Sequence, residues 1–215
     1  TRGPSVQRDE ADFVTAWRGA DSWAMVVGTT NSAVDSSAAP TVPQSDSLPC
    51  RPWLDQGVAA ATANQLSKAE QLLATAARAC PGEARVLREY AAVLFRQGRY
   101  AEAIPWAMQS LELAPNDSLT WQLLGTSRYL TADPLGALQA WHQIGRLTVD
   151  HVDIAGAQQG HHAPVATAVG PLVHRILTPR DLAIARRRLR ELPALQGATI
   201  EYLPLAGGLA EVQVA

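Results

Sequence analysis

The sequence predicts a mostly α fold, in which three helical hairpins form a solenoid and a small α+β domain follows. Two observations carry this prediction. Between Cys50 and His151, residues of one kind recur every 34 positions, and after Leu147 the apolar pattern changes from helical spacing to alternation. We therefore divide the chain into an N-terminal arm and linker (1–49), three hairpins (50–148) and a C-terminal domain (149–215).

The 34-residue interval relates three kinds of position: a large apolar residue, a small residue four later, and an alanine sixteen after the first. A small residue four after a bulky one lies on the same helix face, where it lets a second helix pack closely. Pro81 and Pro115 close the first two copies. About three such copies must stack to bury a core. The three sets are Trp53, Leu87 and Trp121; Gly57, Ala91 and Gly125; and Ala69, Ala103 and Ala137.

This pattern resembles the tetratricopeptide repeat (TPR). The resemblance implies a groove, lined by the first helix of each hairpin, that binds an extended or helical segment of a partner protein. A mildly basic groove with aromatic residues suits an acidic segment or a C-terminal carboxylate. The alternative is an arginine-rich face that only meets solvent. By helical phase, the groove residues are Arg51, Leu54, Arg85, Arg88, Phe95, Arg96, Gln122 and Tyr129.

The two cysteines stand at neighbouring ends of the first hairpin. Cys50 lies at the start of its first helix and Cys80 at the end of its second, antiparallel helix. We therefore expect a disulfide, although two free buried thiols remain the alternative. Closing a loop of about 30 residues stabilises the fold by about 3–4 kcal/mol in the chain-entropy model. Such a bond persists in an oxidising compartment, which favours the bacterial periplasm or the cell exterior over the cytosol.

The N-terminal arm combines aromatic and charged residues. Phe13, Trp17 and Trp23 lie in an apolar segment that is too short and too charged to cross a membrane. We expect it either to anchor the chain on a partner or a membrane surface, or to pack as a short helix on the chain's own repeats. Residues 31–48 are rich in Ser, Ala and Pro and read as an extended linker.

Beyond Leu147 the pattern predicts strand, helix, helix, strand, strand. The first strand ends before Gly156, and helices follow at about 163–173 and from Thr178 to just before Pro193. Thr178 is the expected N-cap of the second helix, with Pro179 in its first turn. Strands at 199–203 and 209–215 are joined by a Gly207-Gly208 turn.

This β-α-α-β-β order resembles the polypeptide-transport-associated (POTRA) domain. The resemblance rests on residues 154–156, 177–182, 191–195 and 202–214. It implies a periplasmic domain that precedes an outer-membrane β-barrel for protein insertion or secretion. It also implies that the strand carrying Thr199, Ile200, Glu201 and Tyr202 lies at a sheet edge, where a partner strand can add.

Composition and motifs favour a binding protein over an enzyme. A net charge of -2 argues against a dedicated nucleic-acid binder, and the longest apolar runs are too short for a transmembrane helix. We find no glycine-rich phosphate loop, nucleophile elbow or cysteine pair at metal spacing. The adjacent His161 and His162 read as a solvated loop. We expect no catalytic activity, no cofactor and no metal site.

Two functional hypotheses follow from these features. The first is a periplasmic scaffold, whose TPR and POTRA-like modules help to assemble or stabilise a membrane protein complex or an outer-membrane barrel. The second is an accessory subunit of a large integral-membrane complex, of the electron-transfer or light-harvesting type, anchored through the arm at residues 1–49. A free groove is required by the first hypothesis, and a long buried attachment by the second.

Overall fold

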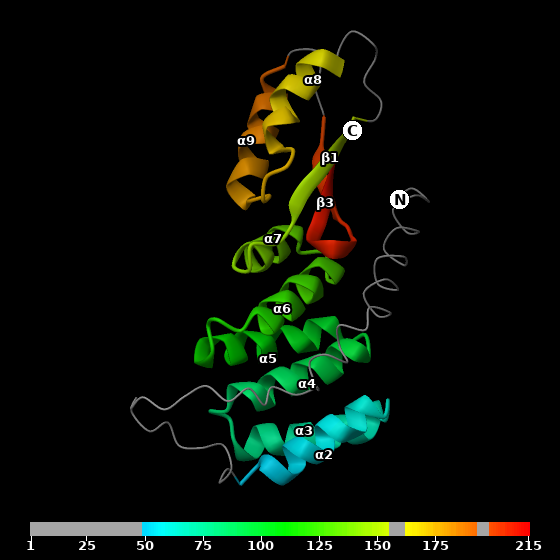
Figure 1. The fold of residues 1–215 in the computed structure, drawn as a ribbon, viewed down its shortest axis with the longest axis vertical. Helices are drawn as coiled ribbons and strands as arrows, with labels where there is room; N and C mark the ends of the chain where they lie inside the picture. The colour runs from blue at the N-terminus through cyan, green and yellow to red at the C-terminus, as the bar shows by residue number, and fades with distance from the viewer. Residues whose placement is uncertain (1–48, 155–161, 193–197) are drawn as a thin grey trace, which may run out of the picture. The chain divides into compact units, whose positions relative to one another are not determined.

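A computed structural model describes residues 49–154, 162–192 and 198–215 (Figure 1). The arm residues Phe13, Trp17 and Trp23, and the linker that follows them, lie outside these ranges. The described chain forms two compact units, which divide between Ala132 and Asp133.

The first unit, residues 49–132, is built from helices that pack on their sequence neighbours. Helices α2 and α3 form one hairpin, α4 and α5 form the next, and α6 packs on α5. The predicted stacking of TPR-like hairpins is thus confirmed for this unit. The helices are α2 (Arg51–Thr62), α3 (Leu66–Ala79), α4 (Ala84–Arg96), α5 (Tyr100–Leu113) and α6 (Ser118–Leu130).

The small residues of the repeat lie where helices approach each other most closely. A Cβ added to the buried Gly57 of α2 would lie 2.6 Å from Cγ of Leu73 in α3. Ala69 and Ala103, one repeat apart, are both fully buried. These positions confirm that the missing side chain of Gly57 permits the close packing predicted from the 34-residue spacing.

Glycine also ends the first helix of the second hairpin. Gly98 follows α4 with φ of 80°, the left-handed conformation that favours glycine. Its N–H donates to the carbonyl of Phe95, and the N–H of Arg99 donates to that of Leu94. This pair of hydrogen bonds is a Schellman motif, which satisfies carbonyls at the end of α4 and turns the chain toward α5.

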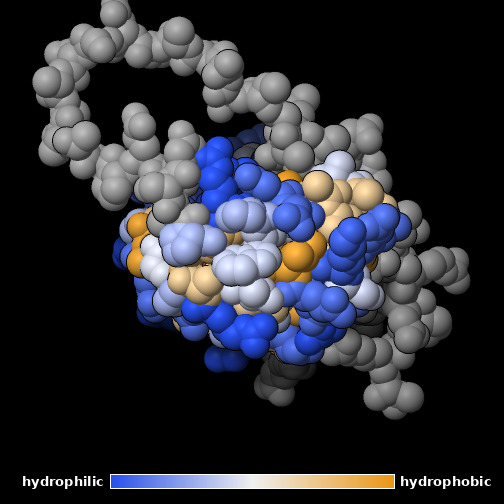
Figure 2. Space-filling view, turned by 90° about the horizontal axis from the view of Figure 1, so that it is seen from below, coloured by the Kyte–Doolittle hydropathy of each residue, from blue (hydrophilic) through white to orange (hydrophobic). Residues whose placement is uncertain are grey.

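The outer surface of the first hairpin is largely polar. Figure 2 views the molecule from below Figure 1, where α2 and α3 lie lowest, and hydrophilic residues cover most of that face with smaller hydrophobic areas between them. Trp53 of α2, a large apolar residue of the repeat pattern, is an exception and is 38% exposed. A stack of repeats needs such a polar outer face where it ends.

The second unit, residues 133–215, combines a helix from the repeat region with the predicted α+β elements. Its three strands lie in the order β1-β3-β2, with β3 parallel to β1 and antiparallel to β2. The observed order of elements after residue 147 is the predicted one. They are α7 (Pro134–His142), β1 (Thr148–Ile154), α8 (His162–Val169), α9 (Pro179–Arg190), β2 (Ile200–Pro204) and β3 (Leu209–Val214), with 3-10 turns at Gly170–Leu172 and Ala206–Gly208.

Helices α8 and α9 pack against the sheet, and Figure 1 shows both on the same side of β1 and β3. Leu182, Ala185 and Leu189 form the buried face of α9. The Oγ1 of Thr178 accepts a hydrogen bond from the N–H of Asp181 at 3.0 Å, so the predicted N-cap is confirmed. The helix predicted at 163–173 ends earlier, because Gly170 and Pro171 begin a 3-10 turn.

Helix α7 is held to the sheet by a side chain from β2. The hydroxyl of Tyr202 donates to the carbonyl of Pro134, at the start of α7, and the Tyr202 side chain is buried. In α7, Leu138 and Trp141 are buried. The 34-residue period assigned this helix to the third hairpin, whereas its contacts group it with the C-terminal elements.

Candidate protein-binding face

The eight residues predicted for the groove lie on α2, α4 and α6, but the structure gives them different environments. Leu54 and Phe95 are only 6% and 7% exposed, so they contribute to the core. Gln122 and Tyr129 of α6 are half-buried. Four arginines remain, and they divide into two that join hairpins and two that face solvent.

Arg88 joins α4 to the start of α6. Its Nη1 donates to Oδ2 of Asp117 at 3.0 Å, and its Nη2 donates to Oε1 of Glu89 at 2.9 Å. Asp117 also accepts from the Thr120 hydroxyl at 2.7 Å and from the N–H of Leu119 at 3.1 Å, which makes it the N-cap of α6. Arg88 therefore helps to hold successive repeats together.

The electrostatics of this pair favour both charges. Burial raises the pKa of Asp117, but the hydrogen bond from Thr120 and the Arg88 guanidinium outweigh it, so the pKa lies below its ordinary value. Burial lowers the pKa of Arg88, but the charge of Glu89 and the hydrogen bonds to Glu89 and Asp117 outweigh this effect, so the pKa lies above its ordinary value. Binding an acidic ligand at Arg88 would have to compete with these two carboxylates.

Arg96 plays a similar part at the other end of α4. Its Nη1 donates to the carbonyl of Ala61 at 2.6 Å, and its Nη2 donates to Oδ1 of Asn64 at 3.1 Å. Both acceptors lie where α2 ends and the chain turns, and Asn64 has a φ of 58°. Arg96 thus fixes the end of α4 against the first hairpin.

The two remaining arginines are exposed. Arg85, in the first turn of α4, makes no ion pair or hydrogen bond through its side chain with any residue that the structure describes. Arg51, at the start of α2, lies 3.5 Å from Oδ2 of Asp55 in a pair whose side chains are 44% and 57% exposed. Solvent screens such a pair strongly, so this ion pair contributes little to stability. Among the four predicted groove arginines, Arg85 is therefore the one whose side chain is not bonded to another described residue.

A second charged cluster lies at the junction of α3 and α5. Arg99 contacts Glu70 and Glu102 at 2.6 Å each, and Gln97 donates to Glu70 at 2.9 Å. The hydrogen bonds from Gln97 and Arg99 lower the pKa of Glu70. These residues join α3 to α5, the second helices of two hairpins, and none of them is a predicted groove residue.

The partners of Arg88 and Arg96 were missed in the sequence reasoning. A signal for Asp117 was present, because it stands 34 residues after Glu83, and the two residues are the N-caps of α6 and α4. Arg88, in the second turn of α4, reaches the start of α6 at Asp117. Asn64 carries no comparable signal.

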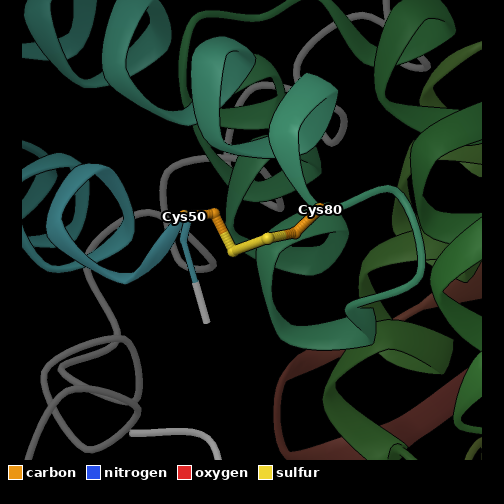
Figure 3. The surroundings of a disulfide bond; sticks show 2 residues. All are labelled: Cys50 and Cys80. Carbon is orange, nitrogen blue, oxygen red and sulfur yellow. A yellow bond between two sulfur atoms is a disulfide. The ribbon is translucent and has the colours of Figure 1, made fainter. Parts of the chain in front are cut away.

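The predicted disulfide is present. Cys50, just before α2, is bonded to Cys80, just after α3, with the two Cα atoms 5.9 Å apart (Figure 3). Both residues are buried, at 0% and 8% exposed. The bond closes the open end of the first hairpin, as the sequence predicted, so neither cysteine is a free thiol.

The residues predicted for strand addition lie on the edge strand β2 or next to it. Thr199 exchanges two hydrogen bonds with Ala215, Glu201 is exposed, and Ile200 and Tyr202 are buried. Arg186 of α9 donates to the outward carbonyl of Ile200 at 3.3 Å. Pro204 has no N–H to offer. Strand addition at this edge stays a prediction, and any added strand would be short.

Among residues 49–154, 162–192 and 198–215, no helix is long and apolar enough to cross a membrane. Within the same ranges, no three His, Cys, Asp or Glu side chains lie together as a metal site would require. The predicted arm anchor at Phe13, Trp17 and Trp23 lies outside these ranges.

Comparison with known proteins identifies the repeats. The family model described as Tetratricopeptide repeat matches residues 84–127, which span α4, α5 and most of α6. A comparison with curated proteins gave no match.

Solved TPR structures resemble part of the chain. The first TPR of Spaghetti (RPAP3), bound to an HSP90 peptide, is 15% identical, with a TM-score of 0.44 over 46% of this chain and 79% of its own. The Sgt2 TPR domain from Aspergillus fumigatus is 28% identical, with a TM-score of 0.42 over 51% and 69%. The globular C-terminal domain of P. aeruginosa LpoP is 28% identical, with a TM-score of 0.40 over 43% and 91%. The family match alone shows that the helices from α4 into α6 carry a tetratricopeptide repeat, a fold of protein-interaction scaffolds.

Proposed function

We propose that this protein is a periplasmic scaffold, which binds an acidic segment of a partner protein on the first helices of its repeats and so helps to assemble or stabilise a membrane protein complex. The repeat fold supports the general class, because stacked TPR hairpins serve protein–protein interaction. One observation carries the choice of surface. Arg85 is an exposed cation on the central first helix, and it is not used to hold the hairpins together.

The charge of the partner follows from how the arginines are employed. Arg88 and Arg96 already have acceptors within the repeats, whereas the exposed Arg85 can pair with an incoming carboxylate. Exposed charges of this kind attract an opposite charge over about 10 Å at ordinary ionic strength. We therefore expect salt to weaken binding.

The disulfide supports the proposed compartment. Structural disulfides such as Cys50–Cys80 form and persist mainly in oxidising compartments, and the periplasm and the cell exterior are of this kind. The three-stranded sheet with its two helices supports a POTRA-like C-terminal module, the type of domain that accompanies outer-membrane barrels. Together these features favour a scaffold at a bacterial membrane.

Charge reversal at Arg85 tests the proposed surface. The tagged protein is expressed in its native host, extracted in mild detergent, and its bound partners are measured for the wild type, Arg85→Glu and Arg78→Glu. Arg78 is an exposed arginine of α3, so its reversal matches the change in net charge away from the proposed surface. We expect Arg85→Glu to lose the partner and Arg78→Glu to keep it. Equal retention by both variants would contradict the proposal.

Deletion of residues 1–48 in the same assay separates this function from an accessory subunit held by its arm. A scaffold that binds through its repeats keeps the partner after the deletion and loses it on Arg85→Glu. The opposite pattern would support the accessory-subunit hypothesis.

A further inference from the structure

Helix α9 in the C-terminal unit is strongly basic, although the whole chain carries a net charge of -2. It contains five arginines and a single aspartate. Leu182, Ala185 and Leu189 turn its apolar face toward the core, and Arg186 bonds to β2. The other side of the helix faces solvent through Arg180, Ala183, Ile184, Arg187, Arg188 and Arg190.

The exposed arginines surround one apolar side chain. Successive helix residues are rotated by about 100°, so Arg180 and Arg187 lie along the middle of the outer face, with Arg188 and Arg190 on its two flanks. Ile184, 39% exposed, lies beside this middle line. The arginines span about 15 Å along the axis. We call this surface the α9 outer face.

Nearby carboxylates neutralise this surface only weakly. Asp181 is engaged at the helix start, where its Oδ2 accepts a hydrogen bond from the Thr178 hydroxyl at 2.6 Å. Glu191 lies 3.0 Å from Arg187, but the two side chains are 60% and 83% exposed. Solvent screens such a pair, so the α9 outer face keeps most of its positive charge.

We propose that the α9 outer face docks on the phospholipid headgroups of an anionic bilayer. Arginine has a long side chain, so Arg188 and Arg190 can reach from the two flanks to phosphates in one plane while Arg180 and Arg187 meet that plane directly. Ile184 then enters the headgroup layer, as apolar residues of interfacial helices do. An acidic peptide would follow one line along the helix and leave a flank unpaired. This docking is independent of the repeat surface.

Vesicle co-sedimentation of the full chain tests the proposal. Vesicles contain either one part phosphatidylglycerol to two parts phosphatidylcholine, or phosphatidylcholine alone. We expect binding to the anionic vesicles only, weakened by salt. The triple variant R180Q/R187Q/R190Q should lower the partition coefficient by about 100-fold, or about fivefold for each arginine. All three side chains are exposed, so the substitutions should leave the fold intact. An unchanged circular dichroism melting curve verifies this.

The control variant R51Q/R78Q/R85Q removes the same charge from exposed positions of the repeat unit. It should keep most of the wild-type binding. Equal loss in both variants would mean that only net charge matters, and would overturn the proposal. So would equal binding to neutral vesicles, or binding of polyglutamate without binding of anionic vesicles.

Discussion

Replacing Gly57 by alanine tests how closely α2 and α3 pack. The new Cβ would lie 2.6 Å from Cγ and 2.9 Å from Cδ2 of Leu73, and 3.4 Å from Cβ of Leu72. Leu73 is fully buried, so its side chain has no open space to move into. Relieving this contact requires a shift of the helix, and overpacking of this kind costs about 1–3 kcal/mol. Alanine regains about 1 kcal/mol of helix propensity relative to glycine.

The clash should therefore exceed the gain, and we expect Gly57→Ala to lower the free energy of unfolding by about 1 kcal/mol. Urea unfolding of the oxidised protein, followed by circular dichroism at 222 nm, measures this change. Ala59→Gly is the matched control, because Ala59 is exposed in the same helix and reports propensity alone. It should cost about 1 kcal/mol.

A double-mutant cycle identifies the clash itself. In a Leu73→Ala background the two closest atoms are absent, so Gly57→Ala should become neutral or stabilising. The reasoning is refuted if Gly57→Ala stabilises the wild type by the amount that Ala59→Gly costs. It is also refuted if the coupling energy between the two positions is below about 0.5 kcal/mol.

Three further predictions concern other contacts. The folded pKa of Asp117 lies below its ordinary value of 3.8, so the stability that its carboxylate contributes is present above that pH and is lost as pH falls through the folded pKa. Asp117→Asn should therefore lower the free energy of unfolding by about 2 kcal/mol near neutral pH, and should weaken the dependence of the urea midpoint on pH in the acid range. Asp55→Asn is the exposed control. Reducing the Cys50–Cys80 bond should cost about 3–4 kcal/mol, and an unchanged urea midpoint in reductant would contradict this. Tyr202→Phe removes the hydrogen bond to Pro134 at the start of α7 and should lower the free energy of unfolding by about 1 kcal/mol. For the same reason, a fragment of residues 133–215, which includes α7, should melt cooperatively, whereas residues 149–215 should not. Cooperative melting of both fragments would show that α7 is dispensable.

The parts of the fold that were predictable are those encoded by short, repeated spacings. A bulky residue with a small one four later lets the two helices of a hairpin pack closely, so the sequence alone placed Gly57 against the second helix. Cys50 and Cys80 mark the two ends of one hairpin, and antiparallel helices bring those ends together. Thr178 and Asp181 satisfy a helix start locally. Each of these features depends on neighbours within one hairpin or one turn.

The environment of the candidate site was less predictable, because it depends on contacts between repeats. Helical phase places Leu54, Arg88 and Phe95 on one face, but it does not show which of them the next hairpin covers. The partner of Arg88 lies 29 residues away, and the partner of Tyr202 lies 68 residues away. The 34-residue period likewise predicted that α7 is the second helix of the third hairpin. In the structure α7 contacts α9, and the carbonyl of its first residue, Pro134, accepts a hydrogen bond from Tyr202.

The central claim is that the first helices of the repeats bind a partner protein, and photo-crosslinking in intact cells tests it most directly. A photo-reactive amino acid is placed at Arg85 in one variant and at Gln109, an exposed residue of the second helix α5, in another. The account predicts a defined crosslinked partner from position 85, recovered from the periplasmic and membrane fractions, and none from position 109. The same crosslinks from both positions, or a partner captured from 109 alone, would contradict it.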